Sequence, residues 1–530
     1  MYRRQFVVGS LAAGIGMVPA LLRDRTAQAQ TPVAPAAQPA APKKSLTARR
    51  FDRNWLRGQA EMLAKRPYVE PRKSLPPALE KLDYDGFRKL RFNGANALWA
   101  KDNLGFTAQF FHLGFLYKTP VHIFQVSDGI AEPVPYSPAM FDFGQAPPEG
   151  LDIPDLGFAG FRLHSPINRP DYLDEIAAFL GASYFRCVAR TQRYGQSARG
   201  IAINTATPKG EEFPRFTSFW IEKPQPGAGS IVVHALLDGP SLSGAYSFRI
   251  IPGRSAVVDV DVVLFPRKEV EKLGLAPLSS MHYFGKNDRI VADDFRPEVH
   301  DSDGLSIWTG AGEWIWRPIV NPSRLRISSF RDRTPRGFGL LQRERHFSSY
   351  EDSEARYDLR PSVWIEPRGD WGAGAVELIE IPTPDETNDN IVAFWVPEIP
   401  AKPGTPLTFS YRMHWCMEPP VGPEAARVVS TRTGLPGYAG APRPQRGRKF
   451  VVTFEGGLLG NLRATDPVEA VVSTSSGTIG TIVAEPMPEL ARWRAVFDVI
   501  AGGDGPIELR SFLRFGQSAL TETWSYQWTP

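Results

Sequence analysis

Short runs of alternating apolar and polar residues, separated by Gly and Pro, recur along most of this 530-residue chain. Residues 230–236, 246–250 and 256–262 are clear examples. Because successive side chains of a strand point to opposite faces, this period of two predicts strands with one buried face. The 47 Gly and 49 Pro interrupt these runs, and long crossover helices are missing, so an antiparallel sandwich is favoured over a βαβ arrangement.

The chain is too long for one ordinary core, and a change in composition suggests where it divides. Six Pro residues interrupt residues 419–448, and further strand patterns follow at 450–454, 468–474, 493–499, 507–515 and 524–528. A stretch of about 100 residues with such spacing suits one immunoglobulin-like domain. We therefore predict an all-β fold, with a large antiparallel β-sandwich over 45–420 followed by an immunoglobulin-like β-sandwich over 421–530.

Two segments fit helices better than strands. The first contains Phe51, Trp55, Met62 and Leu63 and ends before a Pro at position 67. The second contains apolar residues at 173, 176, 177 and 180, the i, i+3, i+4, i+7 spacing of a helix face, with Asp before it and Gly after it.

The first 29 residues are typical of a cleavable export signal. Arg3 and Arg4 precede a mildly apolar run, and Ala27 and Ala29 form an A-x-A cleavage site near Ala29. The Arg pair favours the twin-arginine route, with a general secretory signal as the alternative. Residues 30–44, rich in Pro and Ala, predict a disordered tether. No later apolar run is long enough to span a bilayer, so we expect a periplasmic protein without stable membrane insertion.

Charge and motif content narrow the function classes. The leader holds four Arg and one Asp, so the rest of the chain is close to neutral and lacks the basic stripe of a nucleic-acid-binding protein. His300, Asp301 and Asp303 could supply metal ligands, but no complete metal motif surrounds them, and phosphate-binding loops are absent. No cofactor or metal is predicted. Cys187 and Cys416 are compatible with a disulfide, although two buried free thiols are favoured.

Two clusters of carboxylates stand beside tryptophans. Residues 300–304 (His-Asp-Ser-Asp-Gly) lead to Trp308, Trp314 and Trp316, and residues 384–390 (Pro-Asp-Glu-Thr-Asn-Asp-Asn) lead to Trp395. Hydrolysis of a glycosidic bond needs two carboxyl groups, and indole faces stack on sugar rings. The alternative is structural, since Asp often caps turns and an acidic loop can simply be solvated. The pattern favours carbohydrate chemistry.

Four longer strings carry a resemblance to a known family. Residues 295–304, 312–318, 364–372 and 386–395 resemble the periplasmic glucan biosynthesis proteins of the G and D type, and the leader is closer to the D type. The resemblance implies a galactose-mutarotase-like N-terminal sandwich and an immunoglobulin-like C-terminal domain. It also implies a role in the biosynthesis of osmoregulated periplasmic glucans, whose backbone is β-1,2-linked glucose.

The resemblance further implies roles for individual residues. Asp389 would be the general acid and Asp301 the general base of an inverting β-1,2-glucan hydrolase, with Tyr357 and Glu386 shaping the site or relaying the proton. An acid at Asp389 requires a raised pKa. Five residues are candidates for substrate binding, weighed against a place in the core: Asp303, Trp308, Trp314, Trp316 and Arg317.

Two functions remain open at this stage. One is a glycoside hydrolase that sets the length of the glucan backbone. The other is a non-catalytic glucan-binding or assembly factor for the same polymer, and an unrelated exported enzyme is a third, weaker reading. Besides the β-1,2-linked glucan, a second copy of the chain and the glucan synthesis machinery are candidate partners.

Overall fold

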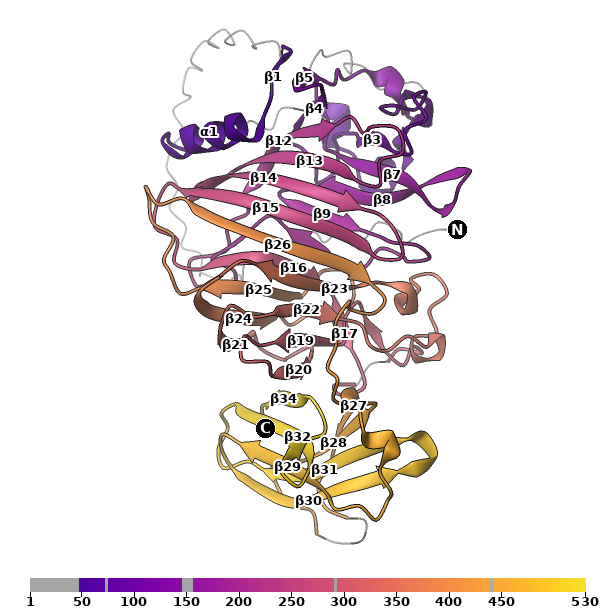
Figure 1. The fold of residues 1–530 in the computed structure, drawn as a ribbon, viewed down its shortest axis with the longest axis vertical. Helices are drawn as coiled ribbons and strands as arrows, with labels where there is room; N and C mark the ends of the chain where they lie inside the picture. Colours follow the sequence, from indigo (N-terminus) through magenta and orange to yellow (C-terminus); the bar gives the residue numbers. More distant parts are fainter. Residues whose placement is uncertain (1–46, 72–74, 145–155, 290–292, 439, 441) are drawn as a thin grey trace, which may run out of the picture.

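The computed structural model describes residues 47–71, 75–144, 156–289, 293–438, 440 and 442–530. The predicted leader, its cleavage site near Ala29 and the tether over 30–44 lie outside the described residues. Strands dominate the described part and form large sheets, so the all-β prediction is confirmed (Figure 1).

The larger sheet has 16 described strands. Among the described strand pairs, β4 with β12 and β20 with β34 are parallel, and the others are antiparallel. In spatial order the strands are β1 (Arg49–Arg50), β5 (Ile130–Pro133), β4 (His122–Ser127), β12 (Arg215–Glu222), β13 (Ile231–Asp238), β14 (Leu242–Ile251), β15 (Ala256–Pro266), β26 (Leu407–Cys416), β23 (Ser362–Arg368), β22 (Gly337–Leu341), β19 (Gly304–Trp308), β20 (Trp314–Pro318), β34 (Thr523–Trp528), β32 (Ile507–Phe515) and β29 (Val468–Thr474), with β33 (Ser518–Ala519) beside β32.

The second sheet has ten described strands and lies behind the first in Figure 1. Its order is β21 (Arg326–Arg333), β24 (Ala373–Glu380), β25 (Ile391–Pro397), β16 (Leu273–Ser280), β10 (Ser197–Arg199), β9 (Tyr184–Cys187), β8 (Tyr172–Leu180), β7 (Gly160–Arg169) and β3 (Thr107–Phe111), with β11 (Ala202–Ile203) beside β16. Two small two-stranded sheets complete this part: β17 (His282–Phe284) with β18 (Val299–His300), and β2 (Arg91–Phe92) with β6 (Phe141–Asp142).

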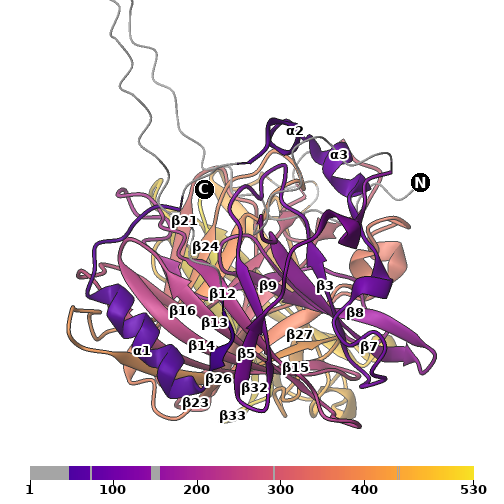
Figure 2. The same cartoon turned by 90° about the horizontal axis from the view of Figure 1, so that it is seen from above.

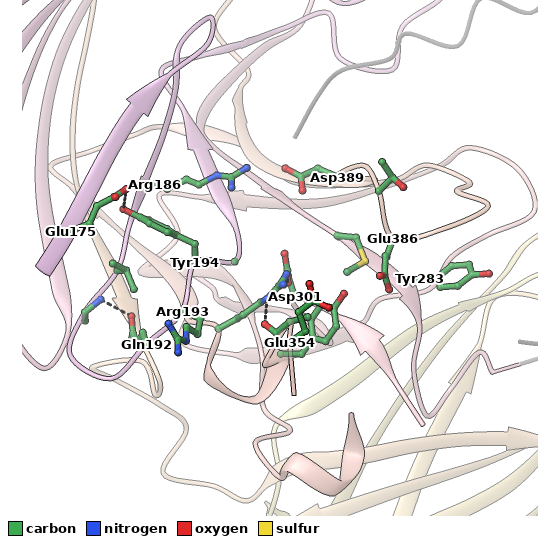
Figure 3. Close-up of a pocket in the computed structure, with 18 of the residues that line it drawn as sticks. Glu175, Arg186, Gln192, Arg193, Tyr194, Tyr283, Asp301, Glu354, Glu386 and Asp389 are labelled. Atoms are coloured by element: carbon green, nitrogen blue, oxygen red, sulfur yellow. Dashed lines mark hydrogen bonds and ion pairs between the residues drawn. The ribbon is translucent and has the colours of Figure 1, made fainter. Parts of the chain in front are cut away.

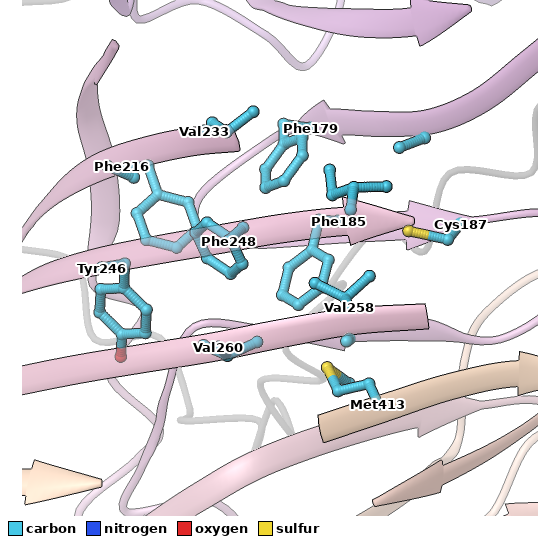
Figure 4. Close-up of a cluster of buried hydrophobic side chains, with 14 of the residues drawn as sticks. Phe179, Phe185, Cys187, Phe216, Val233, Tyr246, Phe248, Val258, Val260 and Met413 are labelled. Carbon is cyan, nitrogen blue, oxygen red and sulfur yellow. The ribbon is translucent and has the colours of Figure 1, made fainter. Parts of the chain in front are cut away.

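Aromatic side chains fill the space between the two sheets (Figure 4). Phe179 and Phe185 of the second sheet meet Phe248 of the first with ring centroids 5.3 and 5.2 Å apart. Each ring is almost completely buried, so these contacts, rather than any single hydrogen bond, fix how the sheets face one another. Cys187 lies in this core, and both it and Cys416 are buried free thiols, as the sequence favoured.

The described residues form three α-helices, which lie outside the sandwich: α1 (Arg53–Ala64), α2 (Pro77–Glu80) and α3 (Tyr84–Lys89). Helix α1 is the first predicted helix and is confirmed. The helix lies against the larger sheet (Figure 2). The Asp52 side chain caps it by accepting the Trp55 N–H, and Leu56 and Ala60 pack on the outer face of that sheet. No helix of the described residues has the length and apolarity needed to cross a bilayer.

The second predicted helix is wrong, because residues 172–180 form strand β8. Register against β7 shifts here: Ala177 pairs with Leu163, whereas Glu175 pairs with His164, which leaves Ile176 as an extra residue. Such a bulge makes Ile176 and Ala177 consecutive buried positions, and this imitates the i+3, i+4 step of a helix. Strand pairing of β8 with β7 and β9 therefore outweighed the helical spacing of its apolar residues.

The C-terminal strands form two layers around a second hydrophobic cluster. One layer is a four-stranded sheet of β27 (Arg427–Gly434), β28 (Gly447–Glu455), β31 (Arg492–Ile500) and β30 (Thr478–Met487), and the other is β34, β32 and β29. The five strands predicted beyond residue 448 are confirmed as β28, β29, β31, β32 and β34. The domain limits, and the likeness to mutarotases and immunoglobulins, stay predictions.

Candidate active site

A cavity of about 690 Å³ opens at the edge of the second sheet (Figure 3). We call it the acidic cavity, because eight Asp and Glu side chains line it against four Arg. It brings together four residues that were predicted for one site and come from three separate parts of the sequence: Asp301, Tyr357, Glu386 and Asp389. Its volume lies within the range of about 300–1,000 Å³ that is usual for ligand-binding pockets.

Asp389 is held at the cavity by its neighbour in the chain. The Asn390 side chain accepts the His282 N–H at 2.8 Å and donates to the His282 carbonyl oxygen at 3.0 Å, which ties the start of β25 to β17. Oδ2 of Asp389 is buried and has no hydrogen-bond partner in the described part of the chain. Burial raises the pKa of Asp389, and the negative charge of Asp301 acts in the same direction against the opposing effect of Arg186. This carboxyl is suited to holding a proton.

Asp301 follows β18 and forms an ion pair with Arg360 through Oδ1. Its backbone N–H donates to the Met281 carbonyl oxygen at 2.8 Å, so both ends of the residue are fixed. The Arg360 guanidinium lies 4.2 Å from the centre of the Tyr357 ring. Burial raises the pKa of Tyr357 to about 12, so this hydroxyl stays protonated at neutral pH and serves as a hydrogen-bond donor.

Glu386 belongs to a cluster organised by one arginine. The Arg296 guanidinium contacts Glu386 at 2.7 Å, Asp352 at 2.9 Å and Asp294 at 2.7 Å. These contacts connect the loop before β25 to two other loops of the cavity wall. The ion pair with Arg296 therefore holds Glu386 in the cavity wall and balances its charge.

The opposite wall holds residues that the sequence did not single out. The Tyr194 hydroxyl donates to Glu175 at 2.9 Å, and Arg162 contacts the other oxygen of Glu175 at 3.1 Å. Burial raises the pKa of Glu175 despite both partners. A helix over 171–180 gives no reason to place Glu175 in a cavity, whereas β8 carries it into the wall beside Arg186 (Figure 3).

The five predicted substrate-binding residues lie elsewhere, and none lines the acidic cavity formed by the described residues. Trp316 is 4% exposed and packs with the C-terminal cluster, and Arg317 is 1% exposed and contacts Glu508 of β32 at 2.8 Å. These two are core residues at the join between β20 and the C-terminal strands, because each finds its partners there. This placement corrects the expectation that they form a sugar platform.

The other three members of that set also have local partners. Trp308 and Trp314 stack with centroids 5.1 Å apart on neighbouring strands, and both are partly buried. The carboxylate of Asp303 accepts the N–H groups of Arg343 and Glu344 at 3.1 Å, so it organises the chain after β22. No group of three or more His, Cys, Asp or Glu within the described ranges is arranged to hold a metal ion.

Comparison with known proteins gives matches over almost the whole described chain. The family described as "Periplasmic glucan biosynthesis protein, MdoG" matches residues 51–528. A probable glucans biosynthesis protein D of Shewanella oneidensis is 49% identical over 483 residues, covering 91% of this chain and 89% of the relative. Glucans biosynthesis protein D of Xanthomonas campestris is 49% identical over 486 residues, covering 91% and 90%.

Among solved structures, a family 36 alpha-galactosidase of Geobacillus stearothermophilus aligns with 48% of this chain and 39% of its own. Its TM-score of 0.24 and 9% identity are too low to carry an argument about fold or chemistry.

Proposed function

Because this chain belongs to the periplasmic glucan biosynthesis protein family, we propose that it acts on the glucan itself, shortening a β-1,2-linked glucose backbone by inverting hydrolysis. The observation that carries the proposal is the carboxyl of Asp389: its Oδ2 is buried without a hydrogen-bond partner among the described residues, its pKa is raised, and it lies in one cavity with Asp301.

In the proposed reaction, Asp389 donates its proton to the glycosidic oxygen as the bond to the anomeric carbon breaks. Asp301 accepts a proton from the water whose oxygen attacks that carbon from the opposite face, so a β-linkage yields an α-anomer. The ion pair with Arg360 fixes the direction of Asp301, and the Tyr357 hydroxyl offers a donor nearby. Glu175 and Tyr194 line the far wall, where neighbouring glucose units would lie.

The test is incubation of the purified protein with linear β-1,2-glucan, followed by product chromatography and NMR of the first-formed anomer. Asp389→Asn should lower kcat by roughly 10²–10⁴-fold while glucan binding persists, because a general acid contributes that much. Asp301→Asn should do likewise. Asp504→Asn is the matched control, since this carboxylate is 95% exposed and outside the cavity.

The pH profile separates the acid from a merely structural carboxyl. Activity should fall as pH rises through the raised pKa of Asp389, since the deprotonated form has no proton to donate. If the wild-type protein binds the glucan but leaves its length unchanged, hydrolysis is refuted and a glucan-binding assembly role takes its place. Release of β-anomers would refute inversion.

A further inference from the structure

A second cavity, of about 460 Å³, lies between the loop after β22 and the C-terminal four-stranded sheet. We call it the basic groove, because seven Lys and Arg line it against three Glu, the opposite balance from the acidic cavity. The two cavities share no lining residue. A neutral sugar chain gives no reason for such a charge, so the groove calls for a different ligand.

The strands of the C-terminal sheet explain why the arginines gather on one face. In β27 the register shifts between Val428 and Ser430, so Arg427 and Arg432 are both exposed although they are an odd number of residues apart. In β31, Arg492 and Arg494 alternate with the buried Trp493. The inward residues form the hydrophobic cluster, and the outward residues line the groove.

Cross-strand register sets these arginines in rows. Arg427 pairs with Glu455, which pairs with Arg492, and Arg494 lies two residues further along the same strand. On the opposite side of the groove, Arg345 is fixed by donating to the Met417 carbonyl oxygen at 3.1 Å. Cations from the C-terminal sheet and from the large sandwich therefore face the same space.

Most of the groove's positive charge is available to a ligand. Arg427 and Arg432 are exposed and form no ion pair within the described ranges. Arg492 contacts Glu455 at 2.5 Å, and Arg494 reaches Glu485 only at 4.0 Å. The side chains of both ion pairs are at least one-third exposed. Exposed ion pairs contribute little, so these guanidinium groups can exchange partners at small cost. Lys286 and Arg343, by contrast, are committed to buried glutamates. The Arg345 guanidinium is likewise committed, because it donates to the Arg360 and Met417 carbonyl oxygens and to the Ser362 hydroxyl.

We propose that the basic groove binds an extended polyanion that carries phosphate or carboxylate groups. Guanidinium groups recognise both anions through paired hydrogen bonds. Arg427 and Arg432 are five residues apart on one strand, a span of about 13–16 Å at the rise of a strand, which a single phosphate cannot bridge. An extended ligand with spaced charges reaches both and also contacts the side of the groove that carries Arg345.

Calorimetric titration tests this directly, with short linear polyphosphate and oligogalacturonate as phosphate and carboxylate probes and a neutral malto-oligosaccharide as the blank. We expect binding of at least one polyanion, weakened by about tenfold or more in Arg427→Ala/Arg432→Ala, because charge-assisted hydrogen bonds are lost. The probe that binds more tightly identifies the anion. Affinity should also fall as salt is raised, since the groove is open to solvent.

The matched control is Arg463→Ala/Arg514→Ala, which removes two exposed arginines of the C-terminal part outside the groove. It has the same net charge as the groove variant and should bind within about twofold of wild type, because neither residue can reach the ligand. Equal losses in both variants, or no binding of either polyanion by wild type, would overturn the proposal. The assay involves no turnover, so its outcome is independent of the glucan test.

Discussion

Arg343 and Glu522 form a buried ion pair where the chain after β22 meets the C-terminal strands. The Glu522 side chain is fully buried and that of Arg343 is 10% exposed. Two bonds connect them, one of them 3.1 Å long, and Glu522 also accepts the Val428 N–H at 2.7 Å. The guanidinium lies over the Trp316 ring, 3.6 Å from its centre. Replacing Arg343 with Met keeps much of the apolar stem, but it removes the charge and the 2.8 Å hydrogen bond that the guanidinium donates to the Val428 carbonyl oxygen.

Arg343→Met should therefore lower the free energy of unfolding by about 3–5 kcal/mol, the usual cost of leaving one buried charge without its partner. Adding Glu522→Gln should restore about 1–3 kcal/mol, because the amide removes the uncompensated charge yet keeps an oxygen for the Val428 N–H. The exposed pair Arg514–Glu469 provides a contrast, and Arg514→Met should cost at most about 1 kcal/mol.

Urea unfolding, followed by tryptophan fluorescence, measures the wild type and the three variants. A loss below 1 kcal/mol for Arg343→Met would refute the premise that the pair is shielded from water. If the double variant with Glu522→Gln is no more stable than Arg343→Met alone, the lost energy comes from the lost contacts with Trp316 and with the Val428 carbonyl oxygen, and not from the buried charge.

Two further predictions concern stability. Burial holds the pKa of His164 at about 3, against 6.5 for the free side chain, so the unfolded chain takes up a proton that the folded one refuses as pH falls between these values. As pH is lowered, the free energy of unfolding should therefore fall more steeply in wild type than in His164→Gln, by up to about 1.4 kcal/mol per pH unit. Urea titration at pH 7, 5.5 and 4.5 measures both proteins. Equal slopes would contradict the prediction. Gly304→Ala places a Cβ 2.1 Å from the Trp316 ring, so it should lower the free energy of unfolding by about 1–3 kcal/mol. The loss should be smaller in a Trp316→Leu background, and urea titration measures both.

Period-two patterning predicted the strands β13, β14, β15, β28, β29, β31, β32 and β34, which the structure confirms. It gave no information on partners: β20 and β34 pair in parallel, although Trp316 and Trp524 are more than 200 residues apart in the chain. Strand partners depend on long-range packing, which local alternation does not encode. The same limit explains β8, where a bulge at Ile176 produced helical spacing within a strand.

The candidate site was predicted unevenly for a related reason. Asp301 and Asp389 were marked by acidic clusters and by the resemblance, and the structure places both in one cavity. Tryptophan next to carboxylate is an ambiguous pattern, because an indole ring can stack on a sugar or pack in a hydrophobic contact between two groups of strands. Trp316 packs in the hydrophobic cluster between β20 and the C-terminal strands. Glu175 had no distinguishing neighbour in sequence, and only the fold of β8 gives it a place in the wall.

At the candidate acid, one residue stabilises the loop and the next residue in the chain carries the proposed chemistry. Asn390 anchors the loop through bonds to His282, whereas Asp389 contributes a buried carboxyl whose charged form is disfavoured. A raised pKa in the folded state means that the stability from Asp389 is present at low pH and is lost as pH rises through that pKa. Asp389→Asn should therefore gain stability relative to wild type between pH 4 and pH 7, measured by urea unfolding. Asn390→Ala should lose about 1–3 kcal/mol at both pH values, because it strands the His282 N–H. If Asp389→Asn instead loses stability as pH rises, its carboxylate is stabilised in the fold and cannot hold the catalytic proton.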